Sequence, residues 1–350
     1  MATIVLKHRD LWKGIRSTSW AQSIPRFYGT SMLVFPRKGS VPSGYTPPIN
    51  LTHPHQSLRM SPLTNIAASS DPQILMETIP LHSHKNETNH EKSGPCIAKL
   101  TLNRPKANAM GKEFIQTLQE LLNCLEEKES NDDLKSIPRS VVITSWSPKV
   151  FSAGADLKER ALMTQEEAAD FVTLLRSTME RVARLPMPVI CAIEGVAVGG
   201  GLELALAADL RIVGANAILG LPETSLAIIP GAGGTQRLPR LIGAARAKEI
   251  IWTARKLNAQ EAFKLGLVEQ VVPVGDATAT AVEMGLRIAN NGPIAVKASK
   301  ESIDRGLECK NIYDALEVER QCYAKVLPTQ DRLEGLAAFR EGRNPRYNGI

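Results

Sequence analysis

The sequence predicts an α/β protein whose strands and helices alternate over the first two-thirds of the chain and then give way to helices alone. Apolar runs rich in β-branched residues, such as VICAI at 189–193, alternate with stretches of helical periodicity, such as 113–127. Such alternation is typical of a parallel sheet with helices packed on it. From residue 276 onward no strand pattern is left, and four helical stretches follow one another. The composition, 43% hydrophobic and 22% charged, is enough to bury a sizeable core.

Each element is expected from its local pattern. Strands are predicted where apolar runs are bounded by turn residues, at 73–81, 96–102, 140–146, 189–193 and 267–272, with a further short strand after residue 209. Helices are predicted at 113–127, 166–185, 202–209, 244–253, 259–264, 278–290, 293–305, 312–326 and 329–341. The first helix has apolar residues at helical spacing from Phe114 to Leu125, which predicts one face packed on the core. The second helix is expected to end because Pro186 and Pro188 follow it.

The first sixty residues differ in composition from the rest of the chain. They contain eight basic residues and one acidic residue, Asp10, so they carry +7, which leaves −1 on the remainder of a chain whose net charge is +6. This leader is rich in Ser, Arg and Pro and lacks the continuous apolar segment of a secretory signal. It has the composition of a mitochondrial or plastid transit peptide, with a disordered tail of no targeting value as the alternative. We therefore expect a transit peptide and leader at 1–65.

The cysteines and histidines do not form a metal-binding pattern. The five cysteines include no C-x-x-C pair, which indicates reduced thiols. Three of the six histidines, His82, His84 and His90, lie in a polar stretch, but no cysteine or carboxylate spacing completes a ligand set. We therefore expect solvated histidines and no metal site.

The most informative stretch of the chain covers residues 189–237. Three consecutive glycines, 199–201, lead into the helix expected at 202–209, whose first turn contains Glu203, and Glu223 follows in a loop. Glycines at a helix start let a ligand touch the backbone and leave N–H groups unpaired at the positive end of the helix dipole. Such amides can stabilise negative charge that develops on an oxygen, and two nearby carboxylates can move protons. The combination predicts chemistry on a carbonyl compound.

Three other interpretations of this stretch compete with the catalytic one. Residues 189–208 are apolar enough to cross a bilayer and contain a glycine spacing seen in membrane helix dimers, but Glu194 and Glu203 make a span costly. GAG at 231–233 resembles a dinucleotide fingerprint, but Gln236 stands where its third glycine belongs. Finally, the glycines could serve only close packing, with Glu203 as an ordinary acid favoured by the helix dipole. The residues alone leave that last alternative open.

The same stretch resembles the crotonase (enoyl-CoA hydratase/isomerase) superfamily. GGGLE at 199–203 and LPE at 221–223 stand where the motifs of that superfamily stand, and the similarity extends over about residues 97–347. FSAGADLKER at 151–160 and DRLEGLAAF at 331–339 are most similar to a mitochondrial subgroup. That subgroup includes methylglutaconyl-CoA hydratase, the AU-rich-RNA-binding homologue, and the enoyl-CoA hydratase domain-containing proteins.

The resemblance implies a fold, an assembly and a location. Residues 72–275 are expected to form the crotonase (ClpP-like) spiral of ββα units, and 276–350 a helical domain that joins subunits into a homotrimer or a dimer of trimers. The expected location is the mitochondrial matrix, with no membrane span. No metal or redox cofactor is expected, because coenzyme A is part of the substrate. One position departs from the family, since the lysine usual three residues after the C-terminal phenylalanine is Gly342 here, and Arg340 or Arg343 could replace it.

The resemblance also implies roles for individual residues. The N–H groups of Ala155 and Gly200 would bind the thioester oxygen as an oxyanion hole. Glu203 would activate water, and Glu223 would protonate Cα. Further contacts with the substrate and its CoA part are expected from Ala153, Asp156, Leu157, Lys158, Gly199, Pro222, Gly231 and Phe339.

The carboxylate pair implies a hydratase that adds water to a trans-2-enoyl-CoA. A short-chain or branched substrate is expected, 3-methylglutaconyl-CoA among them, in fatty-acid or branched-chain amino-acid breakdown. One alternative is a Δ3,Δ2-enoyl-CoA isomerase, although the isomerases of the superfamily generally use a single acid/base. Another is an RNA-binding homologue, but residues 106–127 carry Lys106 and Lys112 against four glutamates, so the basic face that RNA affinity needs is missing. A third is a subunit without turnover, which an intact pair of carboxylates argues against.

Overall fold

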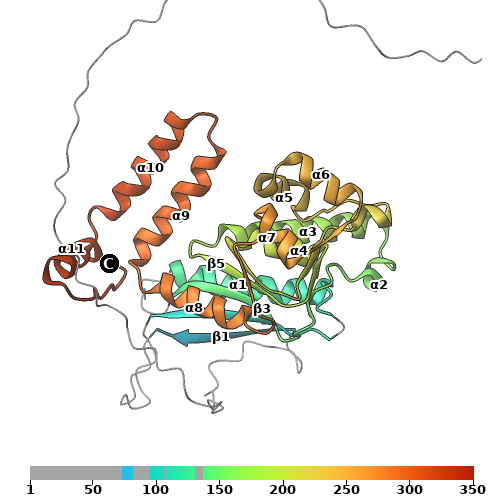
Figure 1. Cartoon of the computed structure of the whole chain (residues 1–350), viewed down its shortest axis with the longest axis horizontal. Helices are drawn as coiled ribbons and strands as arrows, with labels where there is room; N and C mark the ends of the chain where they lie inside the picture. The colour runs from blue at the N-terminus through green and yellow to red at the C-terminus, as the bar shows by residue number, and fades with distance from the viewer. Residues whose placement is uncertain (1–72, 82–94, 106, 131–136) are drawn as a thin grey trace, which may run out of the picture. The chain divides into compact units, whose positions relative to one another are not determined.

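The computed structural model describes residues 73–81, 95–105, 107–130 and 137–350 (Figure 1). The expected leader, 1–65, lies outside the described residues, and so do the histidines of the polar stretch and Lys106. All described residues belong to one compact unit of the chain. None of the helices in this described part is both long and apolar enough to span a membrane.

Two sheets carry the fold. The larger sheet has the order β1-β2-β3-β5-β7-β10, and the smaller one the order β4-β6-β8-β9. In the larger sheet the strands are β1 (Ile74–Pro80), β2 (Cys96–Leu102), β3 (Pro138–Ser145), β5 (Val189–Ile193), β7 (Leu210–Gly214) and β10 (Gln270–Val272). In the smaller sheet they are β4 (Val150–Ser152), β6 (Val196–Val198), β8 (Ile218–Gly220) and β9 (Lys256–Asn258). Only the edge pairs β1–β2 and β8–β9 are antiparallel within these two sheets.

Successive strands alternate between the two sheets, and this alternation makes a spiral. β3 is followed by β4, β5 by β6 and β7 by β8, so each pair contributes one strand to each sheet. Helix α3 (Gln165–Arg184) leads from the first pair to the second, and α4 (Gly200–Ala207) from the second to the third. The chain therefore repeats a ββα unit, and the fold expected from the sequence is confirmed.

Both faces of the larger sheet are covered, which explains why its parallel strands are apolar throughout. Alternate residues of a strand point to opposite faces, so in β5 Cys191 joins one core cluster and Ile190 the other. Helices α1 (Lys112–Ser130) and α3 supply apolar side chains to the first cluster. Helix α8 (Ala277–Ala289) packs against β2, β3, β5 and β7, and Ala277, Ala281 and Ala289 belong to the second cluster.

The last three helices bury little apolar surface. They are α9 (Pro293–Glu308), α10 (Ile312–Val326) and α11 (Gln330–Glu341), and α9 packs along α10 (Figure 1). The exposed large apolar residues on and between them are Ile303, Leu307, Ile312, Tyr313, Leu316, Tyr323, Leu327, Leu333, Leu336 and Phe339. Apolar surface of this extent is typical of an interaction site. Oligomerisation through these helices, expected from the sequence, stays a prediction.

The sequence and the structure differ mainly at short elements. The pattern did not predict α2 (Leu157–Arg160), the 3₁₀ helix η1 (Glu223–Leu226), α5 (Gly234–Ile242) or the three-residue strands of the smaller sheet. The remaining helices, α6 (Ala244–Trp252) and α7 (Ala259–Leu265), lie within one residue of their expected bounds. The strand expected at 267–272 covers only Gln270–Val272, because the N–H of Leu267 donates back to the carbonyl of Ala262 in α7 and pairing with β7 begins at Gln270.

Candidate active site

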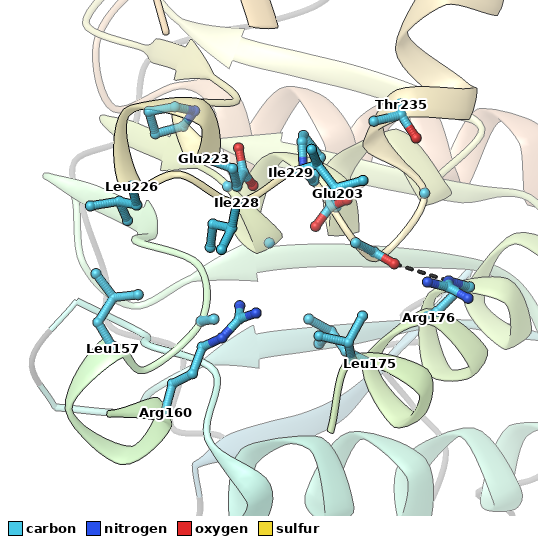
Figure 2. Close-up of a pocket in the computed structure, with 18 of the residues that line it drawn as sticks. Leu157, Arg160, Leu175, Arg176, Glu203, Glu223, Leu226, Ile228, Ile229 and Thr235 are labelled. Atoms are coloured by element: carbon cyan, nitrogen blue, oxygen red, sulfur yellow. Dashed lines mark hydrogen bonds between the residues drawn. The ribbon is translucent and has the colours of Figure 1, made fainter. Parts of the chain in front are cut away.

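A cavity of about 840 Å³ lies between α2, α3, α4, η1 and the start of α5. Nine of the residues expected at the site line it: Ala153, Ala155, Leu157, Gly199, Gly200, Glu203, Pro222, Glu223 and Gly231. They come from three segments, 153–157, 199–203 and 222–231, and Figure 2 shows the side chains that surround the space. The volume is within the range of sites for small molecules.

Glu203 lies in the first turn of α4 and is only 2% exposed. Its Oε1 accepts hydrogen bonds from the N–H groups of Ala232 and Gly234, each at 2.8 Å. Burial raises the pKa of this carboxyl, while the two amides and the charges of Arg237 and Arg176 act in the opposite direction. Both amides donate to Oε1. Oε2 has no hydrogen-bond partner among the described residues, so it can bind a ligand.

The local sequence fixes Glu203 at this place. A Cβ on Gly234 would lie 3.0 Å from Glu203 Oε1, so the glycine lets the backbone of α5 reach the carboxylate. A Cβ on Gly201 would lie 2.4 Å from the carbonyl oxygen of Ser152, so α4 rests directly on β4. At the other end of α4, the buried Arg211 donates hydrogen bonds to the carbonyls of Ala205 and Ala208. The helix that carries Glu203 is therefore held at both ends.

Glu223 occupies a less polar environment at the start of η1. Its Oε2 is buried and has no hydrogen-bond partner among the described residues. Burial raises the pKa of this carboxyl to about 7, and the charge of Glu203 adds to the effect while Arg160 opposes it. Gly199, with φ of +54°, lets Glu223 approach, since a Cβ there would lie 3.1 Å from Glu223 Oε1. Near neutral pH this carboxyl is therefore present in both its protonated and its ionised form.

Two backbone amides meet at the same cavity. Neither the N–H of Ala155 nor that of Gly200 has an acceptor among the residues that the structure describes. A Cβ built on Gly200 would lie 3.5 Å from the nitrogen of Ala155, which shows how closely the two segments approach. Gly154 makes this approach possible, because its own Cβ would lie 2.8 Å from the nitrogen of Gly200. Two unpaired N–H groups at one spot can bind an oxygen that gains negative charge.

Three expected substrate contacts do not line this cavity. Asp156 accepts hydrogen bonds from the first turn of α2 as its N-cap, and it forms an ion pair with Arg104 at 2.9 Å. Lys158 is exposed on α2, and Phe339 is 87% exposed on α11. Their proposed contacts with the CoA part of a substrate stay predictions.

The structure gives a physical reason for the unusual residue at position 342. Gly342 ends α11 with φ of +66°, a left-handed conformation that glycine adopts without strain. Of the two arginines that could replace the missing lysine, Arg343 is engaged in ion pairs with Glu334 and Glu341. The side chain of Arg340 forms no ion pair within the described part of the chain, so we expect Arg340 to be the one available to a phosphate.

Sequence reasoning missed much of the cavity wall. Its further lining residues are Arg160, Val172, Leu175, Arg176, Leu226, Ala227, Ile228, Ile229, Pro230, Gly233, Thr235 and Gln236. One signal could have found Arg160: it follows Leu157 by three residues, and that spacing places both side chains on one side of a helix. The residues from α3 and from the loop after η1 come close only through the tertiary fold.

The assembled groups suit one kind of chemistry. Two amides can hold an oxyanion, a carboxylate fixed by two amides can accept a proton, and a carboxyl with a raised pKa can donate one. No three His, Cys, Asp or Glu side chains of the described residues come together as metal ligands would. The expectation that no cofactor takes part stays a prediction.

Comparisons of the sequence and of the structure with known proteins find relatives of one family. Residues 92–349 match the family described as enoyl-CoA hydratase/isomerase. A protein of Arabidopsis thaliana named "probable enoyl-CoA hydratase 2, mitochondrial" is 49% identical over 278 residues, which are 79% of this chain and 89% of that protein. Human "methylglutaconyl-CoA hydratase, mitochondrial" is 43% identical over 264 residues, 74% of this chain and 76% of that one. The crystal structure of an enoyl-CoA hydratase from Bacillus anthracis superposes with a TM-score of 0.70 at 49% identity, covering 74% of this chain and 98% of that one.

Proposed function

The chain belongs to the enoyl-CoA hydratase/isomerase family and is a hydratase, and from this premise we propose that it adds water reversibly to a short or branched trans-2-enoyl-CoA. One observation carries the proposal: two unpaired amides and two carboxylates in different environments surround a single cavity. An isomerase that shifts a double bond needs one group that moves protons, whereas a hydratase must activate water as well.

The proposed mechanism assigns one task to each group. The thioester oxygen lies between the N–H groups of Ala155 and Gly200, and each such donor typically lowers the barrier by about 2.7–4 kcal/mol. Glu203 takes a proton from water while the resulting hydroxide bonds to Cβ, and the negative charge moves to the thioester oxygen as an enolate. Glu223 then gives its proton to Cα. Burial raises the pKa of both carboxyls, but at Glu203 two amide donors oppose this effect and support the ionised form, whereas Oε2 of Glu223 has no donor among the described residues.

We also propose that the protein is mitochondrial and that it forms an oligomer. The basic leader and the two relatives named as mitochondrial support the location. Because a bacterial enzyme is 49% identical, similarity of the catalytic part does not by itself indicate a mitochondrial location. The exposed apolar residues of α9, α10 and α11 support assembly into a trimer or a dimer of trimers.

Crotonyl-CoA tests the activity directly. We expect the purified protein to remove the ultraviolet absorbance of the conjugated thioester and to form 3-hydroxybutyryl-CoA, identified by its mass. In water labelled with ¹⁸O the product should carry one labelled oxygen. An enzyme that interconverts 3-enoyl-CoA and 2-enoyl-CoA without taking up labelled oxygen would contradict the proposal.

The raised pKa of Glu223 predicts the pH dependence of hydration. Because the proton that reaches Cα comes from Glu223, the active form is the protonated one, and it is lost as the pH rises through about 7. We therefore expect kcat/KM for crotonyl-CoA hydration to fall on the alkaline side of that value, and to fall again in acid, where Glu203 takes up a proton. Initial rates across a pH series measure this profile. A rate that stays constant from neutral to alkaline pH would contradict the role of Glu223.

A further inference from the structure

The loop 230–234 holds Glu203 through two of its peptide groups. The N–H groups of Ala232 and Gly234 both donate to Glu203 Oε1 at 2.8 Å. A carboxylate that is held at one oxygen turns only as far as its donors allow, so the direction of Oε2 depends on how these two peptide groups are oriented. The parts of the chain that fix the loop therefore also fix the proposed base.

Arg176 binds the first of these peptide groups from its other side. Its Nε, on α3, donates to the carbonyl oxygen of Gly231 at 3.0 Å, which Figure 2 shows as a dashed line. That carbonyl belongs to the same planar peptide group as the N–H of Ala232, and in a trans peptide the two point in opposite directions. One peptide group thus lies between a guanidinium group and the carboxylate of Glu203. Hydrogen bonds linked in this way polarise and strengthen one another.

Arg237 holds the next peptide group along the loop. Its Nη1 donates to the carbonyl oxygen of Ala232 at 3.1 Å, and its Nη2 forms an ion pair with Glu180 of α3 at 2.9 Å. A Cβ on Gly233 would overlap this guanidinium group, so the glycine makes room for it. The loop is thereby connected to α3 twice, through Glu180 and through Arg176.

The peptide group that carries the N–H of Gly234 needs no side chain to hold it. Its carbonyl oxygen, on Gly233, accepts the N–H groups of Gln236 and Arg237 at 3.0 and 2.8 Å. Both donors are backbone groups at the start of α5, so the helix itself fixes this peptide group. Of the two peptide groups that bind Glu203, only the first therefore depends on a side chain, that of Arg176.

The charges near the loop favour the ionised form of Glu203. The charged side chains on and behind the cavity wall around Glu203 are Arg160 of α2, Arg176 and Glu180 of α3, Glu223 of η1 and Arg237 of α5. Burial raises the pKa of Glu203, and the two amide donors and the charges of Arg237 and Arg176 oppose that rise. Without the charge of Arg176 the carboxyl would keep its proton up to a higher pH.

Resting on the proposed hydratase function, we infer that Arg176 is a positioning residue for Glu203. Through the peptide group of Gly231 and Ala232 it keeps Oε1 bound, so that Oε2 is directed at the water that loses its proton, and Arg176 itself does not touch the reacting atoms. An arginine that bound the substrate instead would change KM when replaced. One that acts through Glu203 changes kcat and the protonation of that carboxyl.

Two substitutions separate the hydrogen bond of Arg176 from its charge. In Arg176→Gln the side-chain nitrogen can occupy the place of Nε, so the donor is kept and the charge is lost, whereas Arg176→Met keeps a chain of similar length and loses both. We expect Arg176→Met to lower kcat for crotonyl-CoA by about tenfold to a hundredfold with KM unchanged, since misplacing a group by about 1 Å can cost about a hundredfold. Arg176→Gln should recover most of this loss. In both variants the acid limb of the pH profile of kcat/KM should move to higher pH.

A double-mutant cycle shows whether Arg176 acts through Glu203. In the Glu203→Gln background there is no carboxylate to direct or to ionise, so adding Arg176→Met should lower kcat by at most about twofold more, whereas independent effects would multiply. Arg181→Met is the matched control, because Arg181 also lies on α3 but forms its ion pair with Glu126 and does not line the cavity. It should behave as wild type in kcat, KM and pH profile.

The outcomes separate this inference from the function on which it rests. The role of Arg176 would be overturned by a full further loss of kcat in the Glu203→Gln background, by a raised KM with kcat unchanged, or by an acid limb that stays in place. Each of these results leaves the hydratase activity of the wild type intact, whereas a wild-type protein that does not hydrate crotonyl-CoA would overturn the proposed function itself. Circular dichroism shows whether each variant is folded, and if Arg176→Met is not, the acid limb of Arg176→Gln still decides.

Discussion

Glu203→Gln is expected to lower kcat for crotonyl-CoA hydration by about 10²–10⁴-fold, the range that a positioned acid or base contributes. The amide oxygen of glutamine can still accept the hydrogen bonds that Ala232 and Gly234 donate to Oε1, so the loop at the start of α5 should keep its place. What is lost is the ability to take a proton from water. The measurement is steady-state kinetics with the variant and wild type side by side.

Glu223→Gln should lower kcat by a similar factor and should also change the pH profile. Because Glu223 has the pKa of about 7, its replacement should also remove the alkaline limb of the pH profile, while the acid limb, which belongs to Glu203, remains. Glu283→Gln is a suitable control, since Glu283 is exposed on α8 and outside the cavity. Turnover by either cavity variant at the rate of the control would refute the assignment of the two carboxylates.

The sequence predicted those parts of the fold and site that local patterns encode. Apolar β-branched runs located β2 and β5 at their observed bounds, and apolar spacing located α10. The glycine-rich stretch and its two glutamates predicted the place of the cavity, because glycines gather where the backbone must approach another group closely. At Gly154 and Gly201 any Cβ would meet backbone atoms of a neighbouring segment. The glycines themselves are visible in the sequence, whereas the contacts that require them are visible only in the structure.

The parts that the sequence did not predict depend on contacts between distant segments. The strands of the smaller sheet have only three residues each, too few for alternation to appear, and they are recognisable only by their pairing. Arg160 and Arg176 look like ordinary exposed cations on helices, and only the tertiary fold shows that both line the cavity of Glu203 and Glu223. The pKa of Glu223 likewise follows from burial, which no local pattern reports.

Gly154→Ala is expected to lower kcat by about 10²–10³-fold, the loss seen when one donor of an oxyanion site is removed. The new Cβ would lie 2.8 Å from both the nitrogen of Gly200 and the carbonyl oxygen of Val198, and backbone atoms cannot turn aside as a flexible side chain can. The segments that carry the two N–H donors must therefore move apart. Because the interaction is strongest with the charged enolate oxygen, kcat should fall more than the affinity for substrate.

Gly154→Ala also places an alanine at positive φ, which strains the backbone. A control variant must separate this strain from the loss of the oxyanion site. Gly243 provides the match, since its φ of +86° is close to the +84° of Gly154, but a Cβ there meets nothing within 4 Å. Both variants should lose stability, by roughly 1–3 kcal/mol for an alanine held at positive φ. Only Gly154→Ala should also lose turnover. Thermal unfolding of both variants, followed by kcat at a temperature where both are folded, measures the two effects separately. Full turnover in Gly154→Ala, or an equal loss in Gly243→Ala, would mean that the approach of Ala155 to Gly200 does not serve catalysis.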